Sequence, residues 1–358
     1  MKICIVGGMI DAKLHSKIFP LQKSELITSI HLIRRQAYSG NKIICHSVPQ
    51  WAQKLLPLAE CWRLTQLFGV CLFHRPKVLI AFGTMPHGIY VWLISKLFRI
   101  KTIQHIMGKN DLRLTFSKQR GQKIAMRAVR SANLVAVRGQ PMIQTLLVNG
   151  VNADNIFIPQ NLHDFDFFSC TIPTIPEYEL IYVGLLAAYK RIDLMLESFA
   201  SSKPNNNKLL IIGDGPEKNN LERQAIELNI EHQVIFAGKI SFQNLPKYYC
   251  KARSFIMTSQ GEGLPMAMIE AMSCGLPVII SDDADITEIA KNEVNALITN
   301  SHHKDCFAQA IVRLRNDESL YQLLRHNALS LRDTKLVEYS VEFQSRLWTE
   351  KIESLYST

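Results

Sequence analysis

Two glutamates eight positions apart mark an apolar stretch in the second half of the chain. The stretch GEGLPMAMIEAMSCGLPV covers 261–278, with Glu262 near its start and Glu270 in its middle. Helical spacing places Glu270 beside the small residues Ala267 and Ala271, so an ionised carboxylate there needs hydrogen-bond donors. A carboxylate has two oxygens and can accept from two neighbouring hydroxyl groups. The pattern therefore predicts a site that binds the hydroxyls of a sugar.

The residues between the two glutamates form the expected start of this helix. They are Gly263, Leu264, Pro265 and Met266. The first N–H groups of a helix have no partner within it, so they can face a bound ligand. A phosphate would be repelled by both carboxylates and would have to lie between them. A ligand of this site would therefore have one sugar at each glutamate and a phosphate between the two sugars. A nucleotide-sugar has this arrangement.

Two further segments offer contacts to phosphate. The turn Gly213-Asp214-Gly215 lies between an apolar run and a helical stretch, and a helix start of this kind suits an anion. Lys190 and Arg191 follow another apolar run at an expected helix start, where two cations oppose the helix dipole unless an anion is bound. The alternatives are a purely structural turn and a solvated pair of cations.

Short β-rich runs alternate with amphipathic helical stretches through the chain. They lie at 2–6, 42–48, 77–82, 101–107, 133–137, 155–159, 179–184, 208–213, 233–238, 254–259, 277–281 and 295–299. Such alternation predicts parallel sheets covered by helices. We expect an α/β protein with two doubly wound, Rossmann-like domains facing a central cleft. Their ranges would be 1–170 and 171–336, and a helix over 337–358 would cross back onto the first domain.

The net charge of +10 is unevenly distributed. Residues 1–170 carry 22 Lys and Arg against 7 Asp and Glu, whereas residues 171–358 carry 19 against 24. The basic half should attract an anionic partner, such as an anionic membrane surface or a phosphorylated lipid, unless it is simply a solvated basic face. The absence of a Lys/Arg block or a zinc-finger spacing disfavours nucleic acid. No apolar run is long enough to span a bilayer.

The remaining composition indicates a cytoplasmic protein. The eight cysteines include no CxxC, so we expect reduced, buried thiols. The opening MKICIVGGMIDAK predicts a strand rather than a signal peptide. His302-His303 lies in a polar run that predicts a solvated loop. The segment DDAD at 282–285 could bind a divalent metal, but it could equally cap the next helix, and we expect no metal requirement.

The second half resembles a known family. Glu262 and Glu270 match the Glu-x7-Glu motif of the retaining glycosyltransferases of family four, which have the GT-B fold. IIGDGPE, FAGKIS, GEGLPMAMIEAMSCGLPVIIS and EIAKNEVNALI follow that family's order over about 179–330. The resemblance implies a hexosyltransferase without a cofactor. It would move a hexose from a UDP- or GDP-sugar to a saccharide or lipid-linked acceptor in surface polysaccharide or glycolipid biosynthesis.

The resemblance also implies roles for individual residues. Glu270 would bind the ribose hydroxyls, Glu262 the transferred hexose and Lys190 the diphosphate. Ile240 would lie near the base, and His105 could contact the donor sugar or could be a core residue. The catalytic candidates are Lys190, Glu262 and His105. The donor-binding candidates are Gly7, Gly8, Arg191, Gly213, Asp214, Gly215, Ile240, Gly263, Leu264, Pro265, Met266 and Glu270.

The chain departs from the family pattern beside a predicted phosphate contact. Leu185 follows Gly184, where the family often has Arg, so one cation is missing unless Arg191 replaces it. In the first half, Gly7 and Gly8 would let the backbone approach the donor closely.

The alternative function is a non-catalytic GT-B partner subunit that binds a nucleotide-sugar without transfer. A nucleotide-dependent oxidoreductase is disfavoured because the third glycine of the dinucleotide fingerprint is absent. The enzyme would be cytoplasmic, with peripheral attachment to the inner face of the membrane.

Overall fold

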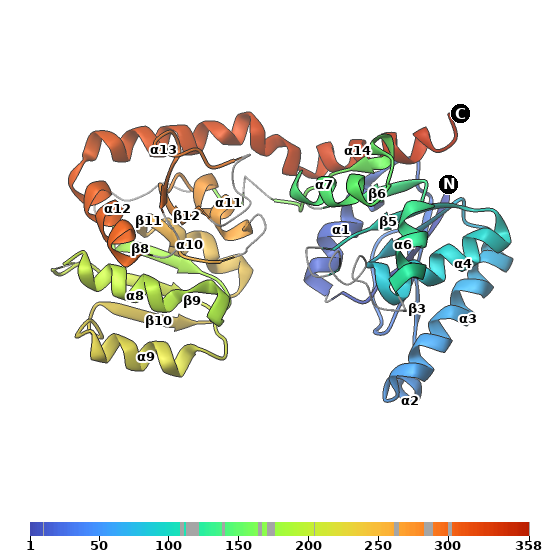
Figure 1. The fold of residues 1–358 in the computed structure, drawn as a ribbon, viewed down its shortest axis with the longest axis horizontal. Coiled ribbons are helices and arrows are strands. Elements are labelled where there is room, and N and C mark those ends of the chain that lie inside the picture. Colours follow the sequence, from blue (N-terminus) through green and yellow to red (C-terminus); the bar gives the residue numbers. More distant parts are fainter. Residues whose placement is uncertain are drawn as a thin grey trace. The chain divides into compact units, whose positions relative to one another are not determined.

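The chain divides into two compact units in the computed structural model (Figure 1). Unit 1 is Met1–Leu162 with Glu338–Thr358, and unit 2 is His163–Val337. The structure describes residues 1–9, 11–107, 111, 122–137, 140–163, 167–169, 176–203, 205–260, 265–282, 289–299 and 303–357. Each unit has one parallel sheet with helices packed against it, which confirms the predicted α/β fold class with two doubly wound domains.

The unit 1 sheet has the strand order β3-β2-β1-β4-β5-β6-β7, and every pair is parallel. The strands are β1 (Lys2–Val6), β2 (Ser29–Arg34), β3 (Ile43–Ser47), β4 (Val78–Phe82), β5 (Lys101–His105), β6 (Leu134–Ala136) and β7 (Ile156–Phe157). The chain reverses its direction of travel across the sheet after β3, beside the central strand β1. Strand β2 was not among the predicted runs, because His31 and Arg34 interrupt its apolar pattern.

The unit 1 helices cover the two faces of this sheet. They are α1 (Asp11–Lys23), α2 (Gln50–Gln53), α3 (Leu56–His74), η1 (Thr84–Gly88), α4 (Ile89–Phe98), α6 (Gln122–Arg130), α7 (Gln140–Val148), η2 (Ala153–Asn155) and α14 (Val341–Ser354). Ile3 and Ile5 share a core with residues of α1 and α14, while Cys4 and Val6 share one with α3 and α4. Trp348 of α14 is almost completely buried in the first of these cores. The carboxyl-terminal helix is therefore an integral part of unit 1.

The unit 2 sheet has the strand order β10-β9-β8-β11-β12-β13, again entirely parallel. The strands are β8 (Tyr178–Val183), β9 (Leu209–Ile212), β10 (Val234–Gly238), β11 (Ala252–Met257), β12 (Val278–Ser281) and β13 (Ala296–Thr299). The helices are η3 (Ala188–Lys190), α8 (Ile192–Ser201), α9 (Lys218–Glu227), η4 (Phe242–Asn244), α10 (Leu245–Tyr249), α11 (Met266–Ser273), α12 (Lys304–Asn316) and α13 (Glu318–Asp333), and the chain passes from unit 2 into unit 1 within η5 (Lys335–Tyr339). Strands buried on both faces explain the nearly continuous apolar runs of this half.

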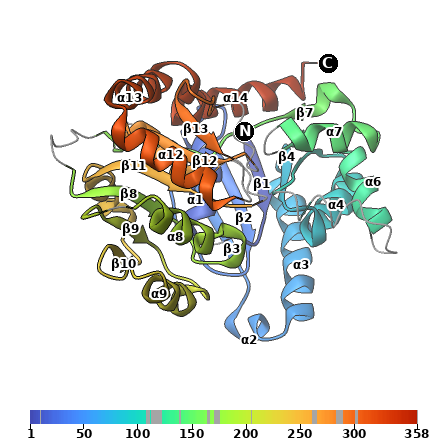
Figure 2. The same cartoon turned by 60° about the vertical axis from the view of Figure 1, so that its left-hand side comes forward.

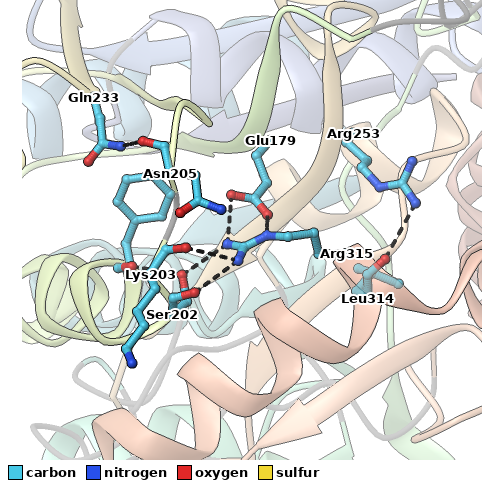
Figure 3. Close-up of polar contacts among 9 residues, drawn as sticks. Glu179, Ser202, Lys203, Asn205, Gln233, Arg253, Leu314 and Arg315 are labelled. Carbon is cyan, nitrogen blue, oxygen red and sulfur yellow. Dashed lines mark hydrogen bonds and ion pairs between the residues drawn. The ribbon is translucent and has the colours of Figure 1, made fainter.

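A charged cluster ties α12 to the start of β8 and the end of α8 (Figure 3). Arg315 forms hydrogen bonds to both carboxylate oxygens of the nearly buried Glu179. Its Nη1 donates to the backbone oxygens of Ser202 and Lys203 at 2.9 and 3.3 Å. Because Glu179 lies near the amino end of β8, this cluster is at the sheet edge opposite the ends of the strands that carry the predicted site.

The cysteines differ from the prediction of uniformly reduced, buried thiols. Cys250 is disulfide-bonded, so that prediction is wrong for this residue. Six others form no disulfide, and Cys61 among them is exposed. Cys170 lies outside the described residues.

Within the described ranges, no helix is both long enough and apolar enough to span a bilayer.

Candidate nucleotide-sugar site

The carboxyl ends of the unit 2 strands gather most of the predicted donor-binding residues of the second half. Because all six strands are parallel, the segments that leave β8, β9, β10 and β11 emerge at one edge of the sheet. Backbone bonds join these segments. The N–H of Leu186 donates to the backbone oxygen of Asp214 at 3.0 Å, and the N–H of Gln260 donates to the backbone oxygen of Tyr189 at 2.8 Å. The structure thus brings together the loops that the sequence assigned to one site.

The two glycines after β9 allow these loops to pack closely. Gly213 has φ +143°, and a Cβ there would lie 1.8 Å from the backbone oxygen of Gly184. A Cβ on Gly215 would lie 2.2 Å from the backbone oxygen of Leu186. Both glycines are required by the approach of the β8 loop, whatever binds beside them.

The turn after β9 is also organised by Asp214. Its carboxylate accepts a hydrogen bond from the N–H of Gly215 at 2.9 Å and lies 3.9 Å from Nζ of Lys239. Helix α9 begins at Lys218, three residues after Gly215. The Asp214 carboxylate therefore already accepts a hydrogen bond from the N–H of Gly215, in the turn that was predicted to bind an anion.

Lys190 and Arg191 lie between β8 and α8. Lys190 is largely buried, with Nζ 5.3 Å from the centroid of the Tyr189 ring. Arg191 adopts a left-handed conformation, and its Nε donates to both carboxylate oxygens of Asp193 at 3.2 Å. Thr258, after β11, donates to the backbone oxygens of Lys190 and Arg191 at 3.2 and 2.7 Å. Asp193 in the first turn of α8 thus partly offsets the charge of Arg191.

Glu270 points from α11 to a buried tyrosine. Tyr249 Oη donates to Glu270 Oε2 at 2.8 Å, and it is 3.4 Å from the backbone oxygen of Ala267. Burial raises the pKa of Glu270 from its ordinary 4.5 to about 7, and the hydrogen bond from Tyr249 opposes this shift. Burial, followed by the neighbouring Glu270 carboxylate, also raises the pKa of Tyr249 well above its ordinary value. Sequence reasoning identified Glu270 but missed Tyr249, because no spacing rule links positions in α10 and α11.

The far side of α11 is held by the segment that enters unit 2. His163 Nε2 lies 2.9 Å from Ser273 Oγ, and Ser273 Oγ donates to the Ile269 oxygen at 2.8 Å. Cys274 Sγ lies 3.3 Å from the backbone oxygen of Phe168, whose ring stacks on His163. These contacts fix the helix that carries Glu270. His163 was also missed by sequence reasoning.

Two of the remaining predicted segments of this half are described, and they lie at or beside the same edge. Pro265 is buried and precedes the first residue of α11, Met266, which is partly buried. Ile240 follows β10 and is partly buried. Glu262, Gly263 and Leu264 lie outside the described residues, as do Asp283, Ala284 and Asp285 of the DDAD segment and His302. In the described part of the chain, no three His, Cys, Asp or Glu side chains are placed to hold a metal ion.

In unit 1, Gly7 and Gly8 follow the central strand β1 and lie against a buried cation and an imidazole. Arg63 Nη2 donates to the Gly7 oxygen at 2.6 Å, and a Cβ on Gly8 would lie 3.2 Å from Cε1 of His87. Burial lowers the pKa of His87 to about 4, with a further contribution from Arg63. His87 is therefore neutral at physiological pH.

His105 ends β5 and is completely buried. Its ring centroid lies 5.3 Å from that of Phe82 and 6.2 Å from that of Trp348. The structure thus places it within the aromatic core of unit 1, which matches the core alternative for this residue. A role in contacting the donor sugar stays a prediction.

The fold is that of the GT-B glycosyltransferases. The crystal structure of Anabaena Alr3699/HepE in complex with UDP superposes with a TM-score of 0.79 at 16% identity, covering 99% of this chain and 100% of that one. Sucrose-phosphate synthase from Thermosynechococcus elongatus superposes with a TM-score of 0.78 at 16% identity, covering 100% and 99%. At such identities the similarity establishes the fold alone.

The match to a sequence family lies in the second half of the chain. Residues 173–330 match the family described as "Glycosyl transferases group 1". The amylovoran biosynthesis glycosyltransferase AmsD of Erwinia amylovora is 25% identical over 259 residues, which are 66% of this chain and 72% of that protein.

Other curated relatives match over a shorter region. An uncharacterized glycosyltransferase of Methanocaldococcus jannaschii, MJ1607, is 29% identical over 153 residues, or 42% of this chain and 39% of that protein. The N-acetyl-alpha-D-glucosaminyl L-malate synthase of Bacillus anthracis is 27% identical over 180 residues, or 50% and 44%. The matches with these two relatives span less than half of their length. Over residues 173–330 the chain is thus similar to the group 1 glycosyl transferases, and its fold is GT-B.

Proposed function

We propose that this protein is a retaining hexosyltransferase of family four. It transfers a hexose from a UDP- or GDP-sugar to a saccharide or lipid-linked acceptor in surface polysaccharide or glycolipid biosynthesis. The observation that carries the proposal is the hydrogen-bonded pair of Tyr249 on α10 and Glu270 on α11, within the region that matches the glycosyl transferase family. The fold likeness to a protein crystallised with UDP and with UDP-glucose supports a nucleotide-sugar as donor.

Glu270 can bind the ribose because its carboxylate, on α11, is held in apolar surroundings where it needs hydrogen-bond donors. Tyr249 fixes Oε2, and the carboxylate can accept further hydrogen bonds from the two neighbouring hydroxyls of a ribose. Those donors would favour the ionised form, which burial disfavours in the free protein. Donor binding and ionisation of Glu270 are therefore coupled.

Lys190 provides the charge that a departing nucleoside diphosphate requires. Breaking the bond between the sugar and the phosphate builds negative charge on the leaving group, and a fixed cation stabilises that charge in the transition state. The backbone of Lys190 is held by Thr258, and the side chain is largely buried, so the ammonium is positioned before the donor arrives. We assign no nucleophile and no metal to the reaction, and we place the enzyme in the cytoplasm.

A non-catalytic subunit that binds the same donor is the second candidate. Leu185 is half exposed at the position where a second cation is expected, and Arg191 is paired with Asp193. With less positive charge available for the leaving group, binding could persist without transfer.

Donor hydrolysis separates the two functions. The protein would be incubated with UDP- and GDP-sugars, and release of nucleoside diphosphate would be followed beside binding measured by thermal shift. A transferase shows slow release that Lys190→Ala abolishes while the variant stays folded. Binding without release in the presence of candidate acceptors would favour the subunit, and the absence of both binding and release would overturn the proposal.

A further inference from the structure

The side of α3 that faces away from the unit 1 sheet carries large apolar residues along the helix, with Thr65 as an exposed polar residue among them. The side that packs on the sheet buries Ala59, Arg63, Leu67, Val70 and Cys71. The opposite side exposes Leu58, Trp62, Phe68, Leu72 and Phe73, and none of the exposed residues of α3 is charged. A surface helix of a soluble protein normally carries its polar residues there. This helix is largely apolar on both sides, and its one buried charged residue, Arg63, is bonded to Gly7 and Glu60.

Helix α2 and the link to α3 extend this surface. Trp51 is 62% exposed and meets Trp62 edge-on, with ring centroids 5.7 Å apart. In Figures 1 and 2, α2 and the first turns of α3 project from the body of unit 1. We call this surface the α2–α3 face, made of Trp51, Leu55, Leu56, Leu58, Trp62, Phe68, Leu72 and Phe73. A concentration of large apolar side chains in water marks an interaction surface.

The charge around the α2–α3 face has one sign. Between residues 50 and 101 the sequence has one acidic residue, Glu60, and seven basic ones, Lys54, Arg63, Arg75, Lys77, Lys96, Arg99 and Lys101. Glu60 is neutralised by Arg63 at 2.8 Å. Lys54 follows α2, Arg75 follows α3, and Arg99 follows α4, which packs beside α3, and all three are exposed. The fitting partner therefore has an apolar interior and an anionic boundary.

A bilayer of anionic lipids has this chemistry. An interfacial helix buries its apolar side about 5–10 Å deep at the boundary between headgroups and acyl chains, while Lys and Arg nearby meet lipid phosphates. Trp is enriched at that depth because its ring is amphipathic. A symmetric contact between two copies is disfavoured, since it would bring the same cationic surroundings face to face.

We propose that the α2–α3 face is a membrane-docking surface that inserts into the headgroup region of an anionic bilayer. The proposal deepens the proposed function, because it rests on an acceptor that is lipid-linked and met at a membrane surface. It assigns the attachment to eight named side chains. The overall basic charge of the first half then adds attraction but does not by itself give the docking site.

The test is flotation with vesicles of phosphatidylglycerol and phosphatidylcholine, beside pure phosphatidylcholine. The protein should float with the anionic vesicles, and its tryptophan emission should shift to the blue. The chain has four tryptophans, of which Trp51 and Trp62 are exposed and Trp348 is buried. The variant Leu58→Gln/Trp62→Gln/Phe68→Gln/Leu72→Gln should bind at least about tenfold more weakly. The matched control Ile226→Gln/Val294→Gln/Leu323→Gln changes exposed apolar residues of unit 2 and should bind as the parent does.

Three outcomes would overturn the membrane proposal. The first is that the parent does not bind anionic vesicles, and the second is that the α2–α3 variant binds them as well as the parent does. The third is that light scattering shows a dimer which the variant disrupts, while neither protein binds vesicles. Thermal shift with UDP on the same proteins keeps the two proposals distinguishable. A variant that still responds to UDP but does not float is folded, with its donor site intact. A parent that floats but ignores every nucleotide contradicts the proposed function alone.

Discussion

Tyr249 Oη donates to Glu270 Oε2 across 2.8 Å, and so a fully buried phenol holds the carboxylate proposed to bind the ribose. The two residues are 21 positions apart and belong to different helices. Burial moves the pKa of the carboxyl into the physiological range, whereas the phenol favours the ionised form. This opposition makes the protonation state of Glu270 responsive both to pH and to the donor.

The first prediction concerns the pH dependence of stability. Because burial raises the folded-state pKa of Glu270 from 4.5 to about 7, the folded protein holds this proton more tightly than the unfolded chain does. The resulting stabilisation is complete below pH 4.5 and is lost as the pH rises to about 7. Glu270→Gln removes this dependence. The free energy of unfolding of the variant minus that of the parent should therefore increase by up to about 3 kcal/mol when the pH is raised from 5 to 8. Urea unfolding at both pH values checks this, and parallel losses in the two proteins would contradict it.

The sequence predicted the strands of both sheets where apolar residues form uninterrupted runs. It missed β2, in which His31 and Arg34 are buried, because single-chain patterns cannot show that tertiary partners will accept a buried polar group. In the site, Glu270 and Lys190 could be found from local conflicts between charge and surroundings. Tyr249 and Thr258 could not, since their partners lie far away along the chain and only the packing of the sheet brings them together.

The second prediction concerns the glycines of the β9 turn. Gly213→Ala would place a Cβ in the backbone oxygen of Gly184 and at an unfavourable φ, so it should destabilise unit 2 by about 3 kcal/mol or more. The matched control is Gly69→Ala in α3, where nothing lies within 4 Å of the added Cβ. Alanine favours helix, so the control should gain up to about 1 kcal/mol. Chemical unfolding monitored by circular dichroism distinguishes them, and equal effects would show that the close approach of the two loops is not required.

The third prediction concerns the Arg315 cluster of Figure 3. Arg315→Met would leave Glu179 nearly buried without its cation and should cost about 3 kcal/mol. Adding Glu179→Gln should recover much of this loss, because the remaining group is then uncharged. Arg313→Met is the control, since both side chains of its pair with Glu293 are exposed and the pair should contribute little to stability. A double variant no more stable than Arg315→Met would contradict the role given to the buried charge.

The fourth prediction concerns the missing cation of the β8 loop. Leu185 is half exposed directly after Gly184, at the carboxyl edge where a diphosphate is expected, and Arg191 is already engaged by Asp193. Leu185→Arg should therefore tighten UDP binding by about tenfold, because a nearby guanidinium forms charge-assisted hydrogen bonds with phosphate. The gain should shrink as salt is raised, as expected for a partly exposed ion pair. Leu329→Arg, at an exposed position on α13, controls for the added charge and should leave affinity unchanged. Titration calorimetry with UDP at two salt concentrations provides the measurement. If both arginines had the same effect, net charge rather than the β8 loop would govern donor affinity, and the placement of the diphosphate beside Leu185 would be wrong.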